Sequence, residues 1–455
     1  MSRPMFALFS FHGRLRPRPY LLSSLVVFFS QHLITILIMA AEGGSFAAAT
    51  RDWQSYVMPL QALAKHSAPS ALTLMSALVG LLLVCWALSA LAFRRAADAE
   101  ASGWIAAFAM VPVVQIATIT LLSAMPARAQ DDVAAANPPG ALGWATAAQG
   151  LFLGMAVTLF AVATAALVFG TYGFGMFVAS PFTIGATTGY CANRRTDLGA
   201  ARTAHLVAAA IVLGGIALVI AALEGLICIL MAAPLAIITA LIGGMLGRAM
   251  ALYSRASVQQ GLSGVALLPL IFAVESSLPT VVAFDTVSRI HIDASPAAVW
   301  KVLINTDLSE EPVALPFRLG LAYPVRGEVI GEGIGSIRLG EFSTGVVVER
   351  ITELIANRKL AFILLNEVPS MRELSPYAEV HAPHVVGYFR TTNTSFELLD
   401  LAEGGSEVIE RTSHQLRLEP VLYWLPLARW VVQANNARVL AHLKRQAEKD
   451  RSTSN

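Results

Sequence analysis

Residues 292–300 read Ile-Asp-Ala-Ser-Pro-Ala-Ala-Val-Trp, and this stretch predicts how a strand passes into a helix. Asp293 or Ser295 supplies a side-chain oxygen that caps the amino end of a helix. Pro296 suits the first helical turn, because the N–H that proline lacks has no partner there. We therefore expect a strand that ends at Ile292 and a helix that begins near Pro296.

After this helix, the sequence changes to short segments that predict antiparallel strands. A hairpin is expected where the chain turns through Glu403-Gly404-Gly405. The last part of the chain predicts a long helix, because apolar residues recur at three- and four-residue steps. This order predicts an α+β domain in which a curved antiparallel sheet surrounds a long C-terminal helix. The expected strands lie at Gly327–Leu339, Gly345–Thr352, Lys359–Leu365, Ser395–Leu401 and Ser406–Leu418, and the helical repeat at Val432, Val439, Leu440, Leu443 and Ala447.

The chain divides into two parts that suit different solvents. It has 455 residues, of which 56% are hydrophobic and only 14% charged, whereas soluble domains carry about 25% charged residues. The first 280 residues hold 23 charged side chains and the remaining 175 hold 39. We therefore expect an α-helical transmembrane bundle followed by a water-soluble part, with the boundary near Leu278–Val281. The net charge of +2 gives no footprint for nucleic acid.

Six stretches are long enough to cross a ~30 Å hydrocarbon core as helices, which takes about 20 apolar residues. Glu224 and Gly225 alone separate the last two, so a tight helical hairpin is expected there. Two further segments stay open: Gly173–Cys191 either spans or re-enters, and Gly261–Val274, which contains Pro269, either spans or lies in the interface. The six stretches are Leu21–Ala41, Ala71–Phe93, Trp104–Ala124, Gln149–Phe169, His205–Leu223 and Leu226–Gly247.

Basic residues before the first stretch predict the orientation. Arg14, Arg16 and Arg18 place the amino end in the cytoplasm, because positively charged flanks stay on that side. Six or eight spans return the soluble part to the cytoplasm, whereas seven would export it. We expect a multi-pass protein of the cell inner membrane with a cytoplasmic C-terminal domain. The first apolar stretch is too long for a secretory signal core, so we interpret it as a retained membrane helix.

The soluble part resembles a known superfamily from Val281 to about Glu448. IDASPAAVW, LPFRLGLAYPVRGEVIGEGIGSIRLGEFSTGVVVERITE and ELSPYAEVHAPHVVGYF resemble the START-like or SRPBCC superfamily, which includes polyketide cyclases and lipid-transfer domains. The resemblance implies a helix-grip fold with an apolar cavity between the sheet and the final helix, and hence a hydrophobic ligand. The superfamily also holds carriers, hydrolases and sensors, so the fold does not choose among functions.

The first third of the chain carries a second resemblance, over roughly residues 10–125. FHGRLRPRPYLL and FRRAADAEASGWIAAFAMVP are similar to a family of small bacterial membrane proteins of unknown function, with an F-x-G-R … S-G-W signature. Ala96-Ala97 stand where that family usually has Leu-His, so any role of that histidine is absent. The resemblance implies no activity. The matching residues are Phe11, Gly13, Arg14, Tyr20, Arg95, Asp98, Ser102, Gly103 and Trp104.

Four regions follow from these observations. An N-terminal membrane domain is expected at 1–125, further transmembrane helices at 126–280, a START-like domain at 281–448 and a polar tail at 449–455. Cys85, Cys191 and Cys228 lie in or beside apolar runs without metal-ligand spacing, so no metal site or cofactor is expected.

The most plausible polar contacts for a ligand lie on the second strand of the hairpin. Glu410 and His414 share one face of that strand and Arg411 lies on the other, so only one set faces inward. Val408 and Leu416 favour the face of Glu410 and His414 as the inner one. If a reaction occurs, we expect His414 as the general acid/base and Glu410 as its orienting partner. The alternative is a buried pair satisfied by its neighbours.

Histidines and tyrosines elsewhere give further candidates for ligand binding. His381 and His384 belong to a loop that lines the cavity mouth, takes part directly in chemistry or is purely structural. Tyr323, Tyr377 and Tyr388 have amphipathic rings that suit a cavity wall, although tyrosines also finish the rims of domains.

Two groups in the strand region have simple structural interpretations. The motif Gly331-x-Gly333-x-Gly335 resembles a phosphate loop only by letter, because no helix follows it, and we interpret its glycines as easing a bent sheet. Arg326, Glu332 and Arg338 alternate with apolar residues, which indicates the solvated face of the sheet.

Polar residues within the apolar stretches mark functional sites in many membrane proteins. His32 lies in the middle of the first stretch and is a candidate of this kind. Glu224 is a weaker one, because a carboxylate at the predicted hairpin turn is solvated near the lipid head groups.

Three functions are compatible with these features. The first is a membrane-anchored START-like domain that binds a hydrophobic, lipid- or isoprenoid-like ligand at the membrane surface for transfer or presentation. The second is a cyclase- or hydrolase-type enzyme that acts on an apolar substrate in the same cavity. The third is a ligand-responsive membrane sensor or scaffold. The expected partners are membrane lipids and a hydrophobic small molecule, and the sequence names no protein partner.

Overall fold

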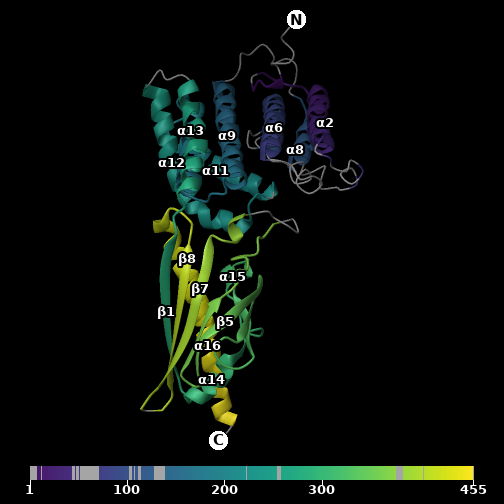
Figure 1. Ribbon diagram of the computed structural model, residues 1–455. Helices are drawn as coiled ribbons and strands as arrows, with labels where there is room; N and C mark the ends of the chain where they lie inside the picture. The colour runs from purple at the N-terminus through teal and green to yellow at the C-terminus, as the bar shows by residue number, and fades with distance from the viewer. Residues whose placement is uncertain are drawn as a thin grey trace. The chain divides into compact units, whose positions relative to one another are not determined.

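The computed structural model describes residues 8–11, 13–41, 43, 47, 51, 71–101, 105–106, 108–110, 114–127, 139–221, 223–253, 258–375, 383–402 and 404–453 (Figure 1). The chain forms two compact units, each described by itself below. Unit 1 comprises Met1–Ser277 and Ser375–Ala382, and unit 2 comprises Leu278–Leu374 and Pro383–Asn455.

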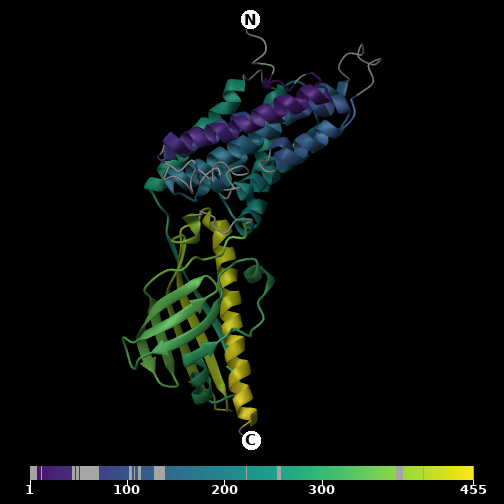
Figure 2. The same cartoon turned by 90° about the vertical axis from the view of Figure 1, so that its right-hand side faces the viewer.

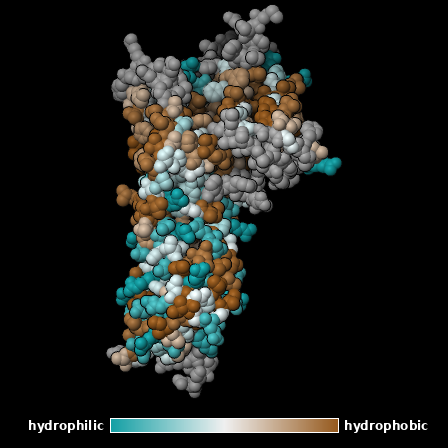
Figure 3. Space-filling view, viewed as in Figure 1, coloured by the Kyte–Doolittle hydropathy of each residue, from teal (hydrophilic) through white to brown (hydrophobic). Residues whose placement is uncertain are grey.

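Unit 1 consists of apolar helices. Within the described part of the chain, five helical stretches are long and apolar enough to cross a membrane. On the face drawn in Figure 3, many of the coloured side chains of this unit are apolar. The five stretches lie in α2 (Pro17–Ala41), α6 (Ala71–Ala99), α9 (Pro139–Ala163) with the π-helical turn η3 (Thr164–Phe169), α11 (Ala200–Ile220) and α12 (Leu226–Tyr253).

The sixth predicted stretch, Trp104–Ala124, contains a shorter helix than expected. Its described residues include the 3₁₀ turn η1 (Phe108–Met110) and the helix α8 (Val114–Ala124). Pro112 lies between these two elements in the sequence, and proline supplies no N–H to continue a helix.

The open segment Gly173–Cys191 is largely helical and enclosed by protein. It contains the π-helical turn η4 (Gly175–Ala179) and most of α10 (Ser180–Asn193), and nearly every residue of α10 is buried. A Cβ at Gly185 or Gly189 would overlap a backbone carbonyl of α12. Small residues let helix backbones approach this closely. The other open segment, Gly261–Val274, lies in the helix α13 (Val258–Ser277).

Unit 2 is a curved antiparallel sheet that grips a long helix, as predicted. Figure 2 shows α16 (Val421–Thr453) running along the sheet. The strand order is β1-β8-β7-β6-β5-β4-β3-β2. The strands are β1 (Val282–Ile292), β2 (Asn305–Asp307), β3 (Pro324–Ile330), β4 (Ile337–Phe342), β5 (Gly345–Ile355), β6 (Lys359–Leu364), β7 (Phe389–Asp400) and β8 (Ser406–Leu416), and the shorter helices are α14 (Pro296–Ile304), α15 (Leu315–Arg318) and η5 (Pro383–Val385).

The opening stretch of unit 2 folds as the sequence predicts. β1 ends at Ile292 and α14 begins at Pro296. Of the two possible capping residues, Ser295 fills this role, since its Oγ accepts a hydrogen bond from the backbone N–H of Ala298 at 3.4 Å.

The predicted strand Gly327–Leu339 is wrong, because the chain reverses within it. β3 ends at Ile330 and β4 begins at Ile337. Gly331, Gly333 and Gly335 in between have φ values of +96°, +82° and +89°. Side chains with a Cβ disfavour this left-handed region, so the three glycines form a turn rather than easing a bent strand.

The hydrophobic core of unit 2 lies between the sheet, α14 and the C-terminal half of α16. Burial of each large aliphatic or aromatic side chain stabilises the fold by roughly 1.5–3 kcal/mol, so this core holds α16 against the sheet. Its fully buried members include Ile292, Val299, Leu303, Ile351, Leu360, Phe362, Phe396, Leu398, Val408, Leu440, Leu443 and Ala447.

Candidate functional site

The inner face of β8 carries three polar residues after Val408. Glu410, Thr412 and His414 are buried, whereas Arg411 and Gln415 on the opposite face are exposed. Strand side chains alternate between faces, and Val408 and Leu416 share the inner face. The predicted orientation of this strand is confirmed.

Glu410 is a buried carboxyl with an unsatisfied oxygen. The residue is only 4% exposed, and no hydrogen-bond partner of its Oε2 occurs among the residues that the structure describes. Burial raises the pKa of Glu410 to about 8, although the nearby Arg338 guanidinium acts in the opposite direction. The carboxyl is therefore mostly protonated and uncharged at neutral pH.

An ion pair on the inner face of the sheet includes the guanidinium that acts on Glu410. Arg338 Nη1 of β4 donates to Glu349 Oε2 of β5, and the guanidinium carbon lies 4.7 Å from the ring centre of Phe362. Burial raises the pKa of the Glu349 carboxyl and the Arg338 guanidinium lowers it. The charge on Glu349 therefore depends on its partner.

Glycines make room for this ion pair. A Cβ at Gly327 of β3 would overlap the Arg338 guanidinium, and one at Gly340 of β4 would lie 2.7 Å from Glu349 Oε1. Charged side chains thus occupy a part of the inner face where a core would ordinarily hold apolar side chains.

A hydrogen-bonded network joins β7, β8, β1 and α16. His414 Nδ1 lies 3.0 Å from Thr391 Oγ1, and His414 Nε2 lies 2.7 Å from Thr412 Oγ1. Thr412 Oγ1 lies 2.5 Å from Thr286 Oγ1, to which Asn436 Nδ2 donates at 3.4 Å. Both ring nitrogens of His414 therefore have partners inside the domain.

His414 is a neutral ring that contacts two aromatic side chains. Its ring centre lies 5.0 Å from that of Phe284 and 5.4 Å from that of Phe389, and both contacts are stacked. Burial lowers the pKa of His414 to about 4, against the nearby Asp285. This geometry supports the interpretation of His414 as a satisfied structural residue, and Thr412 separates it along the strand from Glu410.

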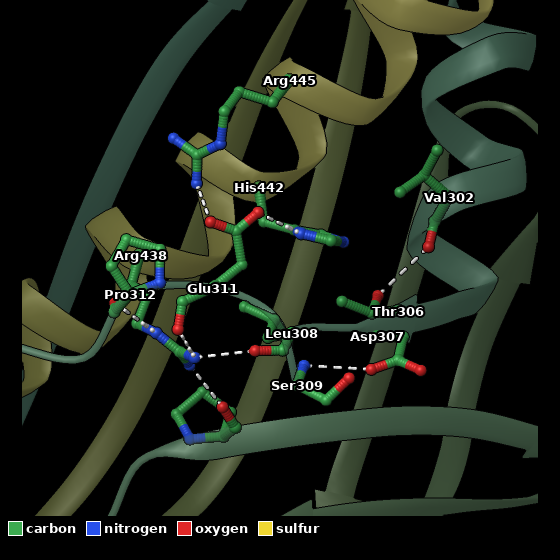
Figure 4. Close-up of polar contacts among 11 residues, drawn as sticks. Val302, Thr306, Asp307, Leu308, Ser309, Glu311, Pro312, Arg438, His442 and Arg445 are labelled. Atoms are coloured by element: carbon green, nitrogen blue, oxygen red, sulfur yellow. Dashed lines mark hydrogen bonds and ion pairs between the residues drawn. The ribbon is translucent and has the colours of Figure 1, made fainter.

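A second polar cluster fastens a loop to α16 (Figure 4). Glu311 accepts from His442 Nδ1 at 2.8 Å and from Arg445. Burial raises the pKa of the Glu311 carboxyl, but these two hydrogen bonds outweigh it and hold the pKa below its usual range. Arg438 donates to the carbonyl oxygens of Leu308, Glu311, Pro312 and Pro324.

Tyr323 and His384, two other predicted binding residues, have partners elsewhere in unit 2. The Tyr323 ring lies 5.2 Å from the Arg438 guanidinium carbon, which places it beside the Glu311 cluster. His384 Nε2 lies 3.3 Å from Glu373 Oε1. Tyr388 is half-buried, and burial raises its pKa. Tyr377 and His381 lie outside the described residues.

Both membrane candidates have contacts within unit 1. His32 is buried in α2, with its ring centre 4.9 Å from that of Phe28. Glu224 is buried and accepts a hydrogen bond from the Tyr172 hydroxyl at 2.9 Å. The expectation of a solvated Glu224 is wrong, because its carboxyl group is buried and accepts this hydrogen bond.

The inner face also holds residues that the sequence does not predict there. Arg338 was assigned to the solvated face, but its side chain is only 11% exposed, whereas Arg326 is exposed as expected. Glu349 and Asn436 went unnoticed. A usable signal existed for Glu349, since it alternates with Val347 and Ile351 within an apolar strand.

Comparisons with known proteins agree with the division into two parts. Residues 8–132 match the family described as "Protein of unknown function (DUF805)", which is consistent with the predicted resemblance to small membrane proteins. The match covers less than half of the chain. No curated protein sequence matches the chain.

Solved structures similar to part of the chain include an enzyme and two proteins of bacterial origin. A truncated norcoclaurine synthase from Thalictrum flavum is 14% identical over 36% of this chain and 93% of its own, with a TM-score of 0.25. The protein MLL2253 from Mesorhizobium loti is 10% identical over 36% and 98%, with a TM-score of 0.23. NE0264 from Nitrosomonas europaea is 11% identical over 37% and 96%, with a TM-score of 0.24. No conclusion about activity follows from similarities this low.

Proposed function

We propose that unit 2 binds an apolar small molecule between its sheet and α16, and that the apolar helices of unit 1 hold it at a membrane. The observation that carries this proposal is the unsatisfied Oε2 of the buried Glu410. A buried polar atom without a partner costs about 1–3 kcal/mol, and a bound ligand would remove this cost by supplying the missing partner.

The distribution of side chains within unit 2 supports this location. The apolar core surrounds Leu440, Leu443 and Ala447 of α16. Nearer the start of the helix, Asn436 faces the polar network of β1 and β8. Ligand sites are mostly apolar with a few placed polar groups, and the inner face near Glu410 has this composition.

The first turns of α16 suit contact with a membrane. Leu422 is 93% exposed and Trp430 is 51% exposed, and Arg429 between them is exposed as well. Tryptophan and arginine favour the head-group layer. A ligand that partitions into lipid would reach unit 2 most easily through such a surface, and the five apolar helices are long enough to provide the membrane anchor.

The test is the recovery of a bound apolar molecule from the whole protein. The full chain is extracted in detergent from cell membranes, and its ligand is identified by native mass spectrometry. We expect one apolar species in stoichiometric amounts in the wild type and in Arg411→Leu, the control on the opposite face of the same strand. The amount should fall in Glu410→Leu, which removes the polar contact. Repeated recovery of only non-stoichiometric bulk lipid would contradict the proposal.

A second candidate function is general acid catalysis by Glu410. A carboxyl with a pKa of about 8 holds its proton at neutral pH and releases it within reach of physiological conditions, as catalytic acids do. Loss of turnover of a bound apolar substrate in Glu410→Gln, with binding retained, would establish it. Retained turnover in that variant would exclude this role of Glu410.

A further inference from the structure

We infer that unit 2 selects ligands whose buried head group is uncharged and accepts a hydrogen bond, such as an alcohol, ketone or ester. This inference rests on the proposed function and names the class of ligand. It follows from the charged groups that surround Glu410 and from the hydrogen bonds that these groups already make.

Two guanidinium groups near the inner face already have partners, although the Nε of Arg338 has none among the described residues. Arg338 is paired with Glu349 and lies over the Phe362 ring. Arg438 on α16 donates to four backbone carbonyls of the loop and β3. A phosphate or carboxylate head group beside Glu410 would meet a guanidinium whose charge Glu349 already balances, and it would lie beside two carboxyl groups. Arg429, which lies over the Phe284 ring, is exposed. Burial of an unpaired anion is strongly unfavourable.

A cationic head group is disfavoured for the opposite reason. It would need the ionised form of Glu410, and the Arg338 guanidinium lies close enough to influence the charge on that carboxyl. A second cation beside Arg338 would be repelled in this buried environment. The only other carboxylate of the inner face described here, Glu349, is already paired.

Uncharged groups provide the remaining polar contacts around the site. His414 is bound by Thr391 and Thr412 and is neutral, and Asn436 is the residue that α16 turns toward the network. His442 on α16 is paired with Glu311. Glu410 in its protonated form has an O–H to donate, so the complementary group on a ligand is a neutral oxygen acceptor.

Three probes with the same tail separate the possible head groups. They are hexadecanol, hexadecyl sulfate and hexadecylamine, each with a diazirine at the same tail position. The full-length protein in detergent is irradiated with each probe at pH 7, digested, and mapped by mass spectrometry. We expect hexadecanol to label peptides of β8 and α16 roughly tenfold more than either charged probe, the ratio for one hydrogen bond of typical strength.

Variants at position 410 link this selectivity to the carboxyl. Between pH 7 and pH 9.5, labelling of unit 2 by the matching methyl ketone should fall in the wild type, because ionised Glu410 no longer donates and the ketone has no O–H to donate in return. In Glu410→Gln, the amide still donates, so labelling should remain and lose its dependence on pH. In Glu410→Leu, labelling by hexadecanol should fall at both pH values.

The outcomes distinguish the inference about the head group from the proposed function. Equal labelling of unit 2 by the three probes, or stronger labelling by a charged one, would overturn the inference about the head group and leave apolar ligand binding intact. Labelling confined to the helices of unit 1 with every probe would overturn the proposed function itself.

Discussion

At the scale of single residues, the buried carboxyl of Glu410 couples the stability of unit 2 to pH. Burial raises its pKa from 4.5 to about 8 in the folded chain. Between these values, the unfolded chain releases a proton that the folded chain keeps. The free energy of unfolding therefore decreases as the pH rises, by up to about 1.4 kcal/mol per pH unit.

Replacement of Glu410 by glutamine should remove this dependence. The amide has no proton to release, so Glu410→Gln should exceed the wild type in stability at pH 8 by up to about 4 kcal/mol and match it near pH 4.5. Urea unfolding of the full chain in detergent, followed by tryptophan fluorescence, measures the difference at each pH. Glu407→Gln on the same strand is the control and should keep the wild-type profile. Parallel profiles of wild type and Glu410→Gln would contradict the prediction.

The ion pair between Arg338 and Glu349 leads to a second prediction at this scale. Each side chain is buried, so removal of one leaves the other as an uncompensated charge. Arg338→Met and Glu349→Leu should each lower the free energy of unfolding by about 3–5 kcal/mol. The double variant should cost far less than the sum of the two, because neither charge then remains. Additive effects in a double-mutant cycle would show that the two groups do not act as a pair.

The sequence predicts the residues of the candidate site that lie on β8, and it does not predict the ion pair between β4 and β5. Alternation along one strand was sufficient to place Glu410 and His414 on the inner face. Arg338 was misplaced because the glycine turn after Ile330 reverses the chain, which assigns Arg338 to a different strand from Arg326. Its contact with Glu349 depends on strand pairing, and no periodicity in a single segment reveals such a pairing.

At the scale of elements, the packing of α10 on α12 depends on glycine. A Cβ at Gly189 would overlap the carbonyl oxygen of Gly244, whereas a Cβ at Gly80 in α6 would meet only the Ile34 side chain, at 3.9 Å. Gly189→Ala should therefore destabilise the protein by about 1–3 kcal/mol through overpacking. Gly80→Ala should be tolerated. Thermal denaturation in detergent, monitored by loss of the monodisperse peak on size exclusion, compares the two. Equal midpoints would contradict this prediction.

The helices of unit 1 differ in how well the sequence predicts them. Long apolar stretches such as α2 and α12 are visible because lipid solvent requires about 20 apolar residues in a row. The sequence leaves open whether the segment that contains α10 spans or re-enters, since its glycines, Ser180 and Pro181 interrupt the apolar run. These small residues become favourable only when α12 lies against them, and that partner follows some 30 residues later in the chain.

At the scale of the whole molecule, charge density alone divided the chain, and the basic residues predict on which side of the membrane each part lies. Arg14, Arg16 and Arg18 before α2 should hold the amino end in the cytoplasm, and an even number of crossings returns unit 2 to the same side. Among the described residues, five helices are long enough to cross. This number is odd, so unit 2 reaches the cytoplasm only if one more apolar segment crosses, such as Val114–Ala124 or Val265–Ser277. A cysteine at Glu332, an exposed position in the turn after β3, tests it in a chain whose Cys85, Cys191 and Cys228 are replaced by alanine. A membrane-impermeant maleimide should label this cysteine in lysed cells and not in intact spheroplasts. A known periplasmic cysteine in the same cells is the control for access of the reagent, and equal labelling before and after lysis would place unit 2 outside.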